Sequence, residues 1–170
     1  NHSDVERMSL SGRWGLALGD AVRVGAIARY YEGAGEEPGY HTLADRTTDP
    51  RMTNGYNASD ADSRDMQQYA LTLDAALGGG LDWASIAYLN RLRDDRHVKF
   101  SASASQQRRL EAEDQYGVTS TLHWHGELSG MVLMLEAGGE VQWQDVESDR
   151  WLAVNRVPSS QTRSQRYDLT

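Results

Sequence analysis

The chain contains no cysteine, three prolines and a single lysine, Lys99, among its 17 basic residues. The absence of cysteine excludes disulfide bonds, thiol nucleophiles and cysteine-ligated zinc sites. The formal net charge of -8 argues against nucleic acid as a partner, because phosphate binding depends on clustered Lys and Arg side chains.

Long hydrophobic runs are also absent. Hydrophobic residues make up 39% of the chain and the mean hydropathy is -0.66, whereas a membrane-spanning helix needs about 20 consecutive apolar residues. This excludes a helical membrane protein but not a membrane β-barrel, whose strands have only one apolar face. Nothing after Asn1 resembles a signal peptide, so we expect that any leader is removed or lies upstream.

The sequence does contain segments in which apolar and polar residues alternate, the pattern of a strand with two different faces. Tight turns join them in pairs at "GDA" (19–21), at the triple glycine Gly78 to Gly80 and at "GELSG" (126–130), which predicts three β-hairpins. "QRYDLT" (165–170) predicts the start of a seventh strand. The six predicted strands cover residues 9–18, 22–31, 68–77, 81–92, 115–125 and 131–144.

Three long polar stretches without a sustained period connect the hairpins, and they predict loops. These stretches are Glu32 to Asp65, Arg93 to Asp114 and Asp145 to Arg163, with a short helical turn as one possibility at 107–113. Strands of about 10 residues, with short turns at one end and long loops at the other, are typical of outer-membrane barrels. Unstructured loops longer than about 12–15 residues are uncommon in compact domains.

The alternation assigns side chains to two faces. We expect one face to contact lipid and the other to line the barrel lumen. The fourth strand has apolar residues in both rows, so its facing stays open. The predicted lipid face includes Leu71, Leu73, Leu133 and Leu135, and the predicted lumen face includes Thr72, Asp74, Glu136 and Glu140.

Aromatic residues lie near the ends of the apolar rows rather than at mid-strand, as expected for the girdles of a membrane barrel. The alternative explanation is the general preference of aromatic residues for strands. Tyr30, Tyr69, Tyr116 and Trp143 lie beside the long loops, and Trp83 and Trp124 lie beside the tight turns.

The phrases "YLNRLRDDRHVKFS", "QYGVTSTLHW", "LEAGGEVQWQD" and "RYDLT" resemble the barrel region of TonB-dependent outer-membrane receptors, which take up ferric siderophores, haem, cobalamin and other scarce ligands. The resemblance implies an all-β fold: an antiparallel up-and-down meander that forms a segment of a large transmembrane β-barrel with long extracellular loops. It also implies location in the bacterial outer membrane, contact with its lipid, transport of an iron-siderophore-type chelate, and a TonB-type energy-coupling partner.

Six strands and the start of a seventh cannot close a bacterial barrel, because the smallest have eight, and the barrels of this family resemble the 22-stranded transporters. We find no energy-coupling box, no plug sequence and no terminal aromatic assembly signal. We therefore expect residues 1–170 to be a single segment of a longer receptor, with the plug outside it. The alternative is a soluble β-sandwich that acts as a binding or adhesion module for carbohydrate or protein.

For a receptor, we expect ligand contacts at the loop-side ends of the strands. Arg29, Tyr31, Arg91 and Arg93 are the candidates, since a delocalised cation and an aromatic plane suit an anionic, ring-bearing chelate. The alternative is that they belong to the barrel wall and pair with Asp or Glu.

Two groups of residues are candidate metal ligands. His123 and His125 share one strand face, and the acidic stretch from Asn57 offers the oxygen ligands that a structural calcium ion prefers, namely Asp60, Asp62 and Asp65. Ordinary lumen residues and a solvated acidic loop are the respective alternatives. No Ser-His-Asp set, phosphate-binding glycine loop or buried carboxylate pair can be assembled, so we do not expect an enzyme.

Overall fold

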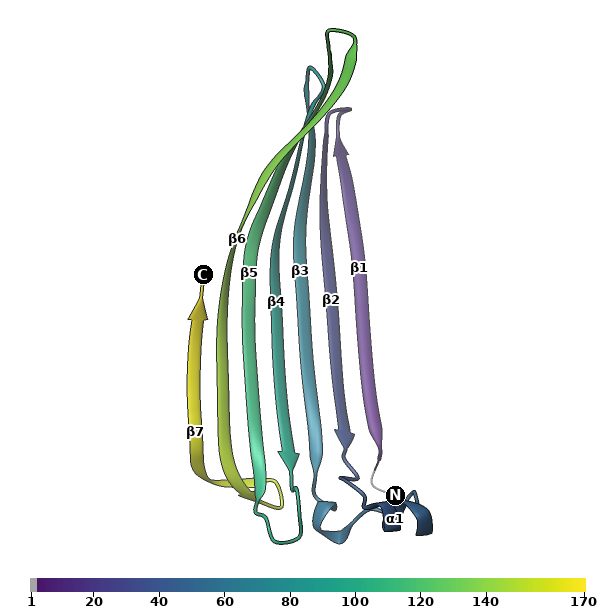
Figure 1. The fold of residues 1–170 in the computed structure, drawn as a ribbon, viewed down its shortest axis with the longest axis vertical. Coiled ribbons are helices and arrows are strands. Elements are labelled where there is room, and N and C mark those ends of the chain that lie inside the picture. The colour runs from purple at the N-terminus through teal and green to yellow at the C-terminus, as the bar shows by residue number, and fades with distance from the viewer. Residues whose placement is uncertain (1–2) are drawn as a thin grey trace.

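The computed structural model describes residues 3–170 as one antiparallel sheet in which neighbouring strands follow the order of the chain (Figure 1). The predicted all-β meander is confirmed. The described helices, α1 (Leu43–Thr48) and the 3-10 turn η1 (Gly55–Asn57), are too short to cross a membrane. The strands are β1 (Val5–Leu18), β2 (Val22–Glu36), β3 (Ala61–Gly78), β4 (Leu81–Val98), β5 (Gln106–Leu128), β6 (Met131–Val154) and β7 (Val157–Leu169).

The three predicted tight turns lie together at one end of the sheet, at the top of Figure 1. In the turn between β3 and β4, Gly79 and Gly80 have φ angles of 62° and 77°. Two successive residues with positive φ fit the right-handed twist of the flanking strands. A Cβ atom on Gly80 would lie 2.0 Å from the carbonyl oxygen of His125, so a side chain is excluded there. Gly80 is therefore a steric requirement of this hairpin, whereas a Cβ atom on Gly78 or Gly79 would meet no atom within 4 Å.

Two of the three predicted long loops are wrong. Strand β4 continues to Val98 and β5 begins at Gln106, while β6 continues to Val154 and β7 begins at Val157. The predicted helical turn at 107–113 is part of β5. These extensions carry polar residues on both faces, so their alternation disappears although the ladder of backbone hydrogen bonds continues. Within the described residues, only the segment between β2 and β3 is a long loop, and it contains α1 and η1.

Cross-strand ion pairs reinforce the polar extensions. Arg93 Nη1 lies 2.9 Å from Asp114 Oδ1, and Arg108 Nη2 lies 2.6 Å from Asp95 Oδ2, both between β4 and β5. Opposite charges on neighbouring strands stabilise a sheet by roughly 0.2–1 kcal/mol per pair. Charge pairing therefore supports these hairpins where apolar contacts do not.

The strand register places every side chain on one of two faces, because successive residues of a strand point to opposite sides. We call the face that carries Leu71 and Leu135 the outer face, and the face that carries Thr72 and Glu140 the inner face. The predicted separation of these two sets is confirmed by the pairing of β2 through β6. The register also settles the facing of β4: Leu81, Trp83, Ala87 and Leu89 are on the outer face, and Ala84, Ile86 and Tyr88 are on the inner face.

The sheet has almost no hydrophobic core. Among the described residues, the buried hydrophobic side chains are Ala75, Val98 and Ala153 alone. Large apolar side chains on the outer face are exposed: Leu10 is 72% exposed and Leu71 is 65% exposed. A β-sandwich buries such a face against a second sheet, and the described chain forms one sheet. The β-sandwich alternative is therefore wrong.

Most outer-face aromatic residues of β3 to β6 form two levels, while Trp14 lies between these levels and Trp151 lies beyond the loop-side level. Tyr69, Leu89, Tyr116 and Trp143 lie in one cross-strand row, and the rings of Tyr116 and Trp143 stack 5.6 Å apart. At the turn end, Trp124 donates a hydrogen bond of 3.2 Å to the carbonyl of Gly79. From Tyr116 to Trp124 the strand rises by about 27 Å. If the strand is tilted by about 40° from the barrel axis, this distance is about 21 Å along the axis, close to the ~25 Å height of the apolar band of membrane β-barrels.

Candidate ligand-binding site

A row of polar side chains crosses the inner face at the level of the outer aromatic row. Asn90 donates a hydrogen bond of 2.9 Å to Gln115, and the Tyr88 hydroxyl donates to Glu140 at 2.9 Å and Gln142 at 3.0 Å. Hydrogen bonds that join side chains of β4 to those of β5 and β6 fix their positions along the wall. The inner face is thus an ordered polar surface.

Arg29 and Tyr31 lie on this inner face at the loop-side end of β2. Arg29 is opposite Gln68, and Tyr31 is opposite Met66. Within residues 3–170, no carboxylate forms an ion pair with Arg29. The predicted neighbourhood of these two residues is present, with the guanidinium available to a ligand.

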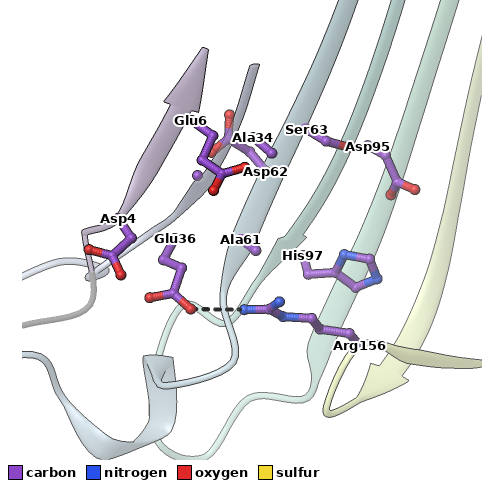
Figure 2. A pocket seen from close by; sticks show the side chains of 11 residues that line it. Asp4, Glu6, Ala34, Glu36, Ala61, Asp62, Ser63, Asp95, His97 and Arg156 are labelled. Carbon is purple, nitrogen blue, oxygen red and sulfur yellow. Dashed lines mark ion pairs between the residues drawn. The ribbon is translucent and has the colours of Figure 1, made fainter. Parts of the chain in front are cut away.

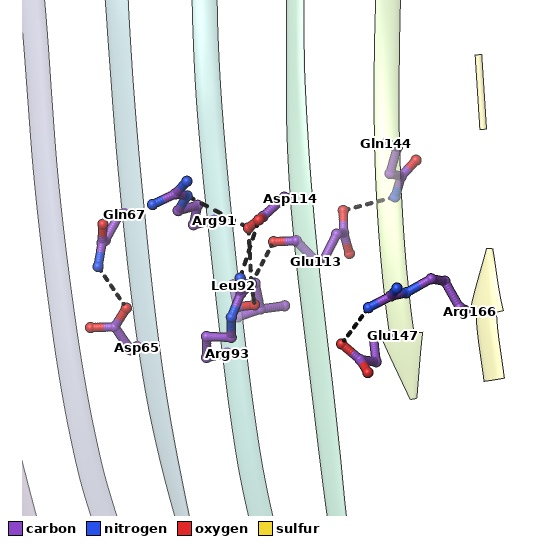
Figure 3. Close-up of polar contacts among 10 residues, drawn as sticks. All are labelled: Asp65, Gln67, Arg91, Leu92, Arg93, Glu113, Asp114, Gln144, Glu147 and Arg166. Atoms are coloured by element: carbon purple, nitrogen blue, oxygen red, sulfur yellow. Dashed lines mark hydrogen bonds and ion pairs between the residues drawn. The ribbon is translucent and has the colours of Figure 1, made fainter. Parts of the chain in front are cut away.

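Arg91 and Arg93 lie on the opposite face, so the four predicted ligand residues do not form one site. Both point toward Asp114 of β5, as Figure 3 shows. Arg93 makes two hydrogen bonds to this carboxylate, at 2.9 and 3.2 Å, and Arg91 Nε lies 3.7 Å from it. The same outer surface carries a second ion pair, between Arg166 and Glu147 at 3.3 Å. These arginines match the alternative in which the guanidinium pairs with an acid.

The three aspartates predicted to bind calcium do not converge. Asp60 is fully buried and accepts hydrogen bonds from Asn57 at 2.7 Å, from the backbone amide of Lys99 at 2.8 Å and from Gln106 at 2.9 Å. Asp62 and Asp65 have opposite parity on β3, and the register pairs Asp62 with Arg96 and Asp65 with Arg93. The carboxylate of Asp60 therefore joins loops of the protein.

His123 and His125 lie on the inner face near the tight turns and contact different carboxylates. His123 Nδ1 is 3.2 Å from Glu136, and His125 Nδ1 is 3.7 Å from Asp82. In the part of the chain that the structure describes, no three side chains of the ligating types are grouped closely enough to hold a metal ion. The two imidazoles are arranged for ion pairing when protonated.

A cavity of about 380 Å³ opens at the loop end of the sheet, between β2, β3 and the turn that joins β6 to β7 (Figure 2). Its charged lining residues are mainly acidic, with Asp4, Glu6 and Glu36 on one side. Arg156 reaches across the opening, and its Nη2 lies 3.8 Å from Glu36 Oε1. Burial lowers the pKa of His97, whose Nε2 is buried without a hydrogen-bond partner. This wall therefore favours the neutral imidazole.

Two features of the loop end escaped prediction from the sequence. One is the buried polar cluster of Asn57, Asp60 and Gln106, and the other is the placement of Arg108 and Arg109 on opposite faces of β5. A polar stretch in a sequence does not show whether its backbone is paired. Had the strand been extended through residues 106–114, the alternation would have separated the two arginines.

No family model and no curated protein sequence matches this chain. Among solved structures, the chain is similar to the ferric citrate transporter FecA in its unliganded form, with a TM-score of 0.85 and 13% sequence identity. The match covers 97% of this chain and 25% of that protein, so the chain spans about a quarter of the length of its structural neighbour. The chain therefore has the fold of a segment of the β-barrel of that transporter.

Proposed function

We propose that this chain is one segment of the barrel wall of a TonB-dependent receptor in the bacterial outer membrane, and that the receptor imports a scarce nutrient. The observation that carries the proposal is the outer face between the two aromatic levels. Its large apolar side chains have no protein to pack against in the described sheet; Leu71 and Leu135, for example, are 65% and 61% exposed. Outer-membrane lipid is the partner that this band fits.

The open edges of the sheet support a larger barrel. The sheet order runs from β1 to β7 without closing. The two edge strands, β1 and β7, therefore each have one edge that is not paired with any described strand. Unpaired backbone groups cannot remain exposed inside a bilayer, and a closed barrel removes such edges. We infer that further strands complete the barrel of the intact receptor, with a plug domain outside residues 1–170.

We propose an iron chelate of the siderophore type as the transported ligand. The structural neighbour is named as a ferric citrate transporter, and the inner face offers a guanidinium and an aromatic ring, at Arg29 and Tyr31, to a molecule in the lumen. Arginine binds carboxylates through a planar fork, and the aromatic ring provides a face for a ring-bearing ligand. A TonB-type partner in the periplasm supplies the energy through the plug.

The test uses the full-length protein in its native cells. Deletion of the gene is expected to abolish uptake of at least one radiolabelled ferric chelate under iron limitation, and the intact gene is expected to restore it. Uptake is expected to stop when the proton-motive force is dissipated or the energy-coupling protein is deleted. Uptake that persists without energy coupling would overturn the transport mechanism. Recovery of the protein in the soluble fraction would overturn the membrane assignment.

A further inference from the structure

Four arginines from neighbouring strands lie in one row across the inner face. Arg96 of β4 pairs with Arg109 of β5, which pairs with Arg150 of β6, which pairs with Arg163 of β7. Like charges directly opposite each other destabilise a sheet. From Leu89 in the outer aromatic row to Arg96, β4 rises by about 23 Å. The row therefore lies near the external rim and needs a physical reason to persist.

Three members of the row have no acidic partner among residues 3–170. Arg96 is paired with Glu37, 2.7 Å away in the loop after β2. Arg109 donates to the amide oxygen of Gln107 at 3.2 and 3.4 Å, and Arg163 donates to Gln165. The Nε atom of Arg150 is buried without any hydrogen-bond partner. A buried donor without an acceptor is destabilising.

The neighbouring carboxylates offset the positive charge of this surface only in part. Asp94 lies two residues before Arg96 on the inner face of β4, and it already forms an ion pair with Arg64. Glu111 is the inner-face carboxylate of β5 next to Arg109, and Asp62 lies opposite Arg96. Burial, followed by the charges of Arg150 and Arg96, lowers the pKa of Arg109, and the charge of Glu111 opposes this shift. An added negative charge would relieve this repulsion.

Aromatic rings hold one guanidinium of the row in place. The Phe100 ring lies 4.9 Å from the guanidinium carbon of Arg109, and Tyr40 stacks on Phe100 with ring centroids 6.4 Å apart. Both aromatic residues come from loops that meet over the end of the sheet. A guanidinium fixed by stacking loses less conformational entropy when it binds an anion.

We propose that Arg109, Arg150 and Arg163 form a binding site for a soluble polyanion that carries several carboxylate or phosphate groups. Neighbouring strands are about 4.8 Å apart, so adjacent guanidiniums can each hold a separate oxyanion group of one ligand. The site lies six strand positions beyond the row of Arg29 and is distinct from it. The inference rests on the proposed function in one respect: the inner face must line a lumen open to water.

The experiment compares two substitutions that remove charge from opposite faces. The full-length receptor is purified with Arg109→Gln and Arg150→Gln combined, and a control carries Arg108→Gln, the adjacent residue that faces outward and pairs with Asp95. Binding of citrate and of inorganic pyrophosphate is measured by calorimetry at low and high salt. The two probes distinguish a preference for carboxylate from one for phosphate.

We expect the unaltered receptor to bind at least one probe, and the double variant to bind it roughly 100-fold more weakly, about 10-fold for each guanidinium removed. The Arg108→Gln control is expected to bind within about twofold of the unaltered receptor. The ligand-free double variant is expected to unfold at the same or a higher temperature, because the substitutions remove like-charge repulsion.

Three outcomes would overturn the site. They are the absence of binding of both probes to the unaltered receptor, equal binding by the double variant, and an equal loss of affinity in the Arg108→Gln control. A lower unfolding temperature with unchanged affinity would show that the row has a structural role instead. Energy-dependent uptake of a ferric chelate by the unaltered receptor is measured separately. Failure of uptake concerns the proposed function, whereas unchanged affinity in the double variant concerns this site.

Discussion

Asp60 and Lys99 connect two loops that are distant in the sequence, through a hydrogen bond of 2.8 Å from the Lys99 backbone amide to the buried Asp60 carboxylate. The same carboxylate accepts from Asn57 and Gln106. The long loop before β3 is thereby tied to the hairpin of β4 and β5. This carboxylate is one of several contacts that order this end of the sheet, together with the hydrogen bond from Asn57 to the Lys99 carbonyl and the ion pair between Arg96 and Glu37.

Asp60→Ala is expected to loosen both loops while the strands remain paired. The substitution leaves the Lys99 amide without its acceptor, at about 1–3 kcal/mol, whereas Asn57 and Gln106 keep the carbonyl oxygens of Lys99 and Ser59 as acceptors. Hydrogen exchange of the Lys99 amide is the direct measurement, and we expect its protection to fall by at least tenfold. Asp65→Ala is the matched control, since Asp65 accepts one bond from Gln67 on the outer face. If added calcium slows exchange at this amide in the unaltered receptor, the stretch from Asn57 to Asp65 does bind the ion.

Leu73→Arg is expected to destabilise the membrane-inserted receptor by roughly 2–4 kcal/mol, as found for charges near the bilayer midplane of barrels. Leu73 lies midway between the Tyr69 level and the turn-end level on the outer face of β3. Thr72→Arg adds the same charge to the neighbouring inner-face position and is expected to cost much less. Reversible unfolding in lipid vesicles measures both. Equal costs would mean that the two faces see the same environment.

Arg29→Ala and Tyr31→Ala are each expected to raise the dissociation constant of the transported chelate about tenfold or more, because each removes a direct contact. Arg91→Ala is a control of the same charge at a similar height on the outer face. It is expected to leave binding unchanged and to weaken only its contact with Asp114. Fluorescence titration of the purified receptor provides the measurement. Unchanged affinity in both inner-face variants would rule out this site.

The turn between β6 and β7 is expected to lose protection as the pH falls. Burial holds the pKa of His97 below its value in the unfolded chain, with Asp95 opposing this shift and Arg108 and Arg156 adding to it. The folded form thus favours neutral imidazole, and its contribution to stability is present above about pH 6.5 and declines as the pH falls toward the folded pKa. Hydrogen exchange near Arg156 between pH 7.5 and 5 follows this change. His97→Gln should remove the dependence, and an unaltered slope in that variant would assign it to another group.

The hairpins, their tight turns and the identity of the two faces were predictable, because the alternation between Leu71 and Thr72, or between Leu135 and Glu136, reflects two different surroundings. The facing of β4 was not, since Ile86 and Tyr88 are apolar or amphipathic residues on the inner face. Pairing with β3 and β5 decides it, and the Tyr88 hydroxyl reaches polar partners there. The misplacement of Arg91 and Arg93 follows from the same ambiguity.

The external extensions were predicted as loops for a different reason. Hydrophobic alternation records contact with an apolar phase, and residues 93–98 and 106–114 have polar side chains on both sides. Their strand structure comes from backbone pairing and from ion pairs such as Arg108 with Asp95, neither of which leaves a periodic signal. The arginine row was hidden for that reason.

The strict neighbour order of the seven strands bears on how such a sheet can assemble. Each strand pairs only with the segments just before and after it, so the sheet can grow by adding one hairpin at a time, each forming locally within about 1–10 μs. At every stage the growing sheet has only two unpaired edges, however many strands have joined. The slow step is then the pairing of the first strand with the last strand of the completed sheet. This pairing closes a long loop, and its entropic cost rises with chain length. In a receptor that assembles in this way, barrel closure is the last step.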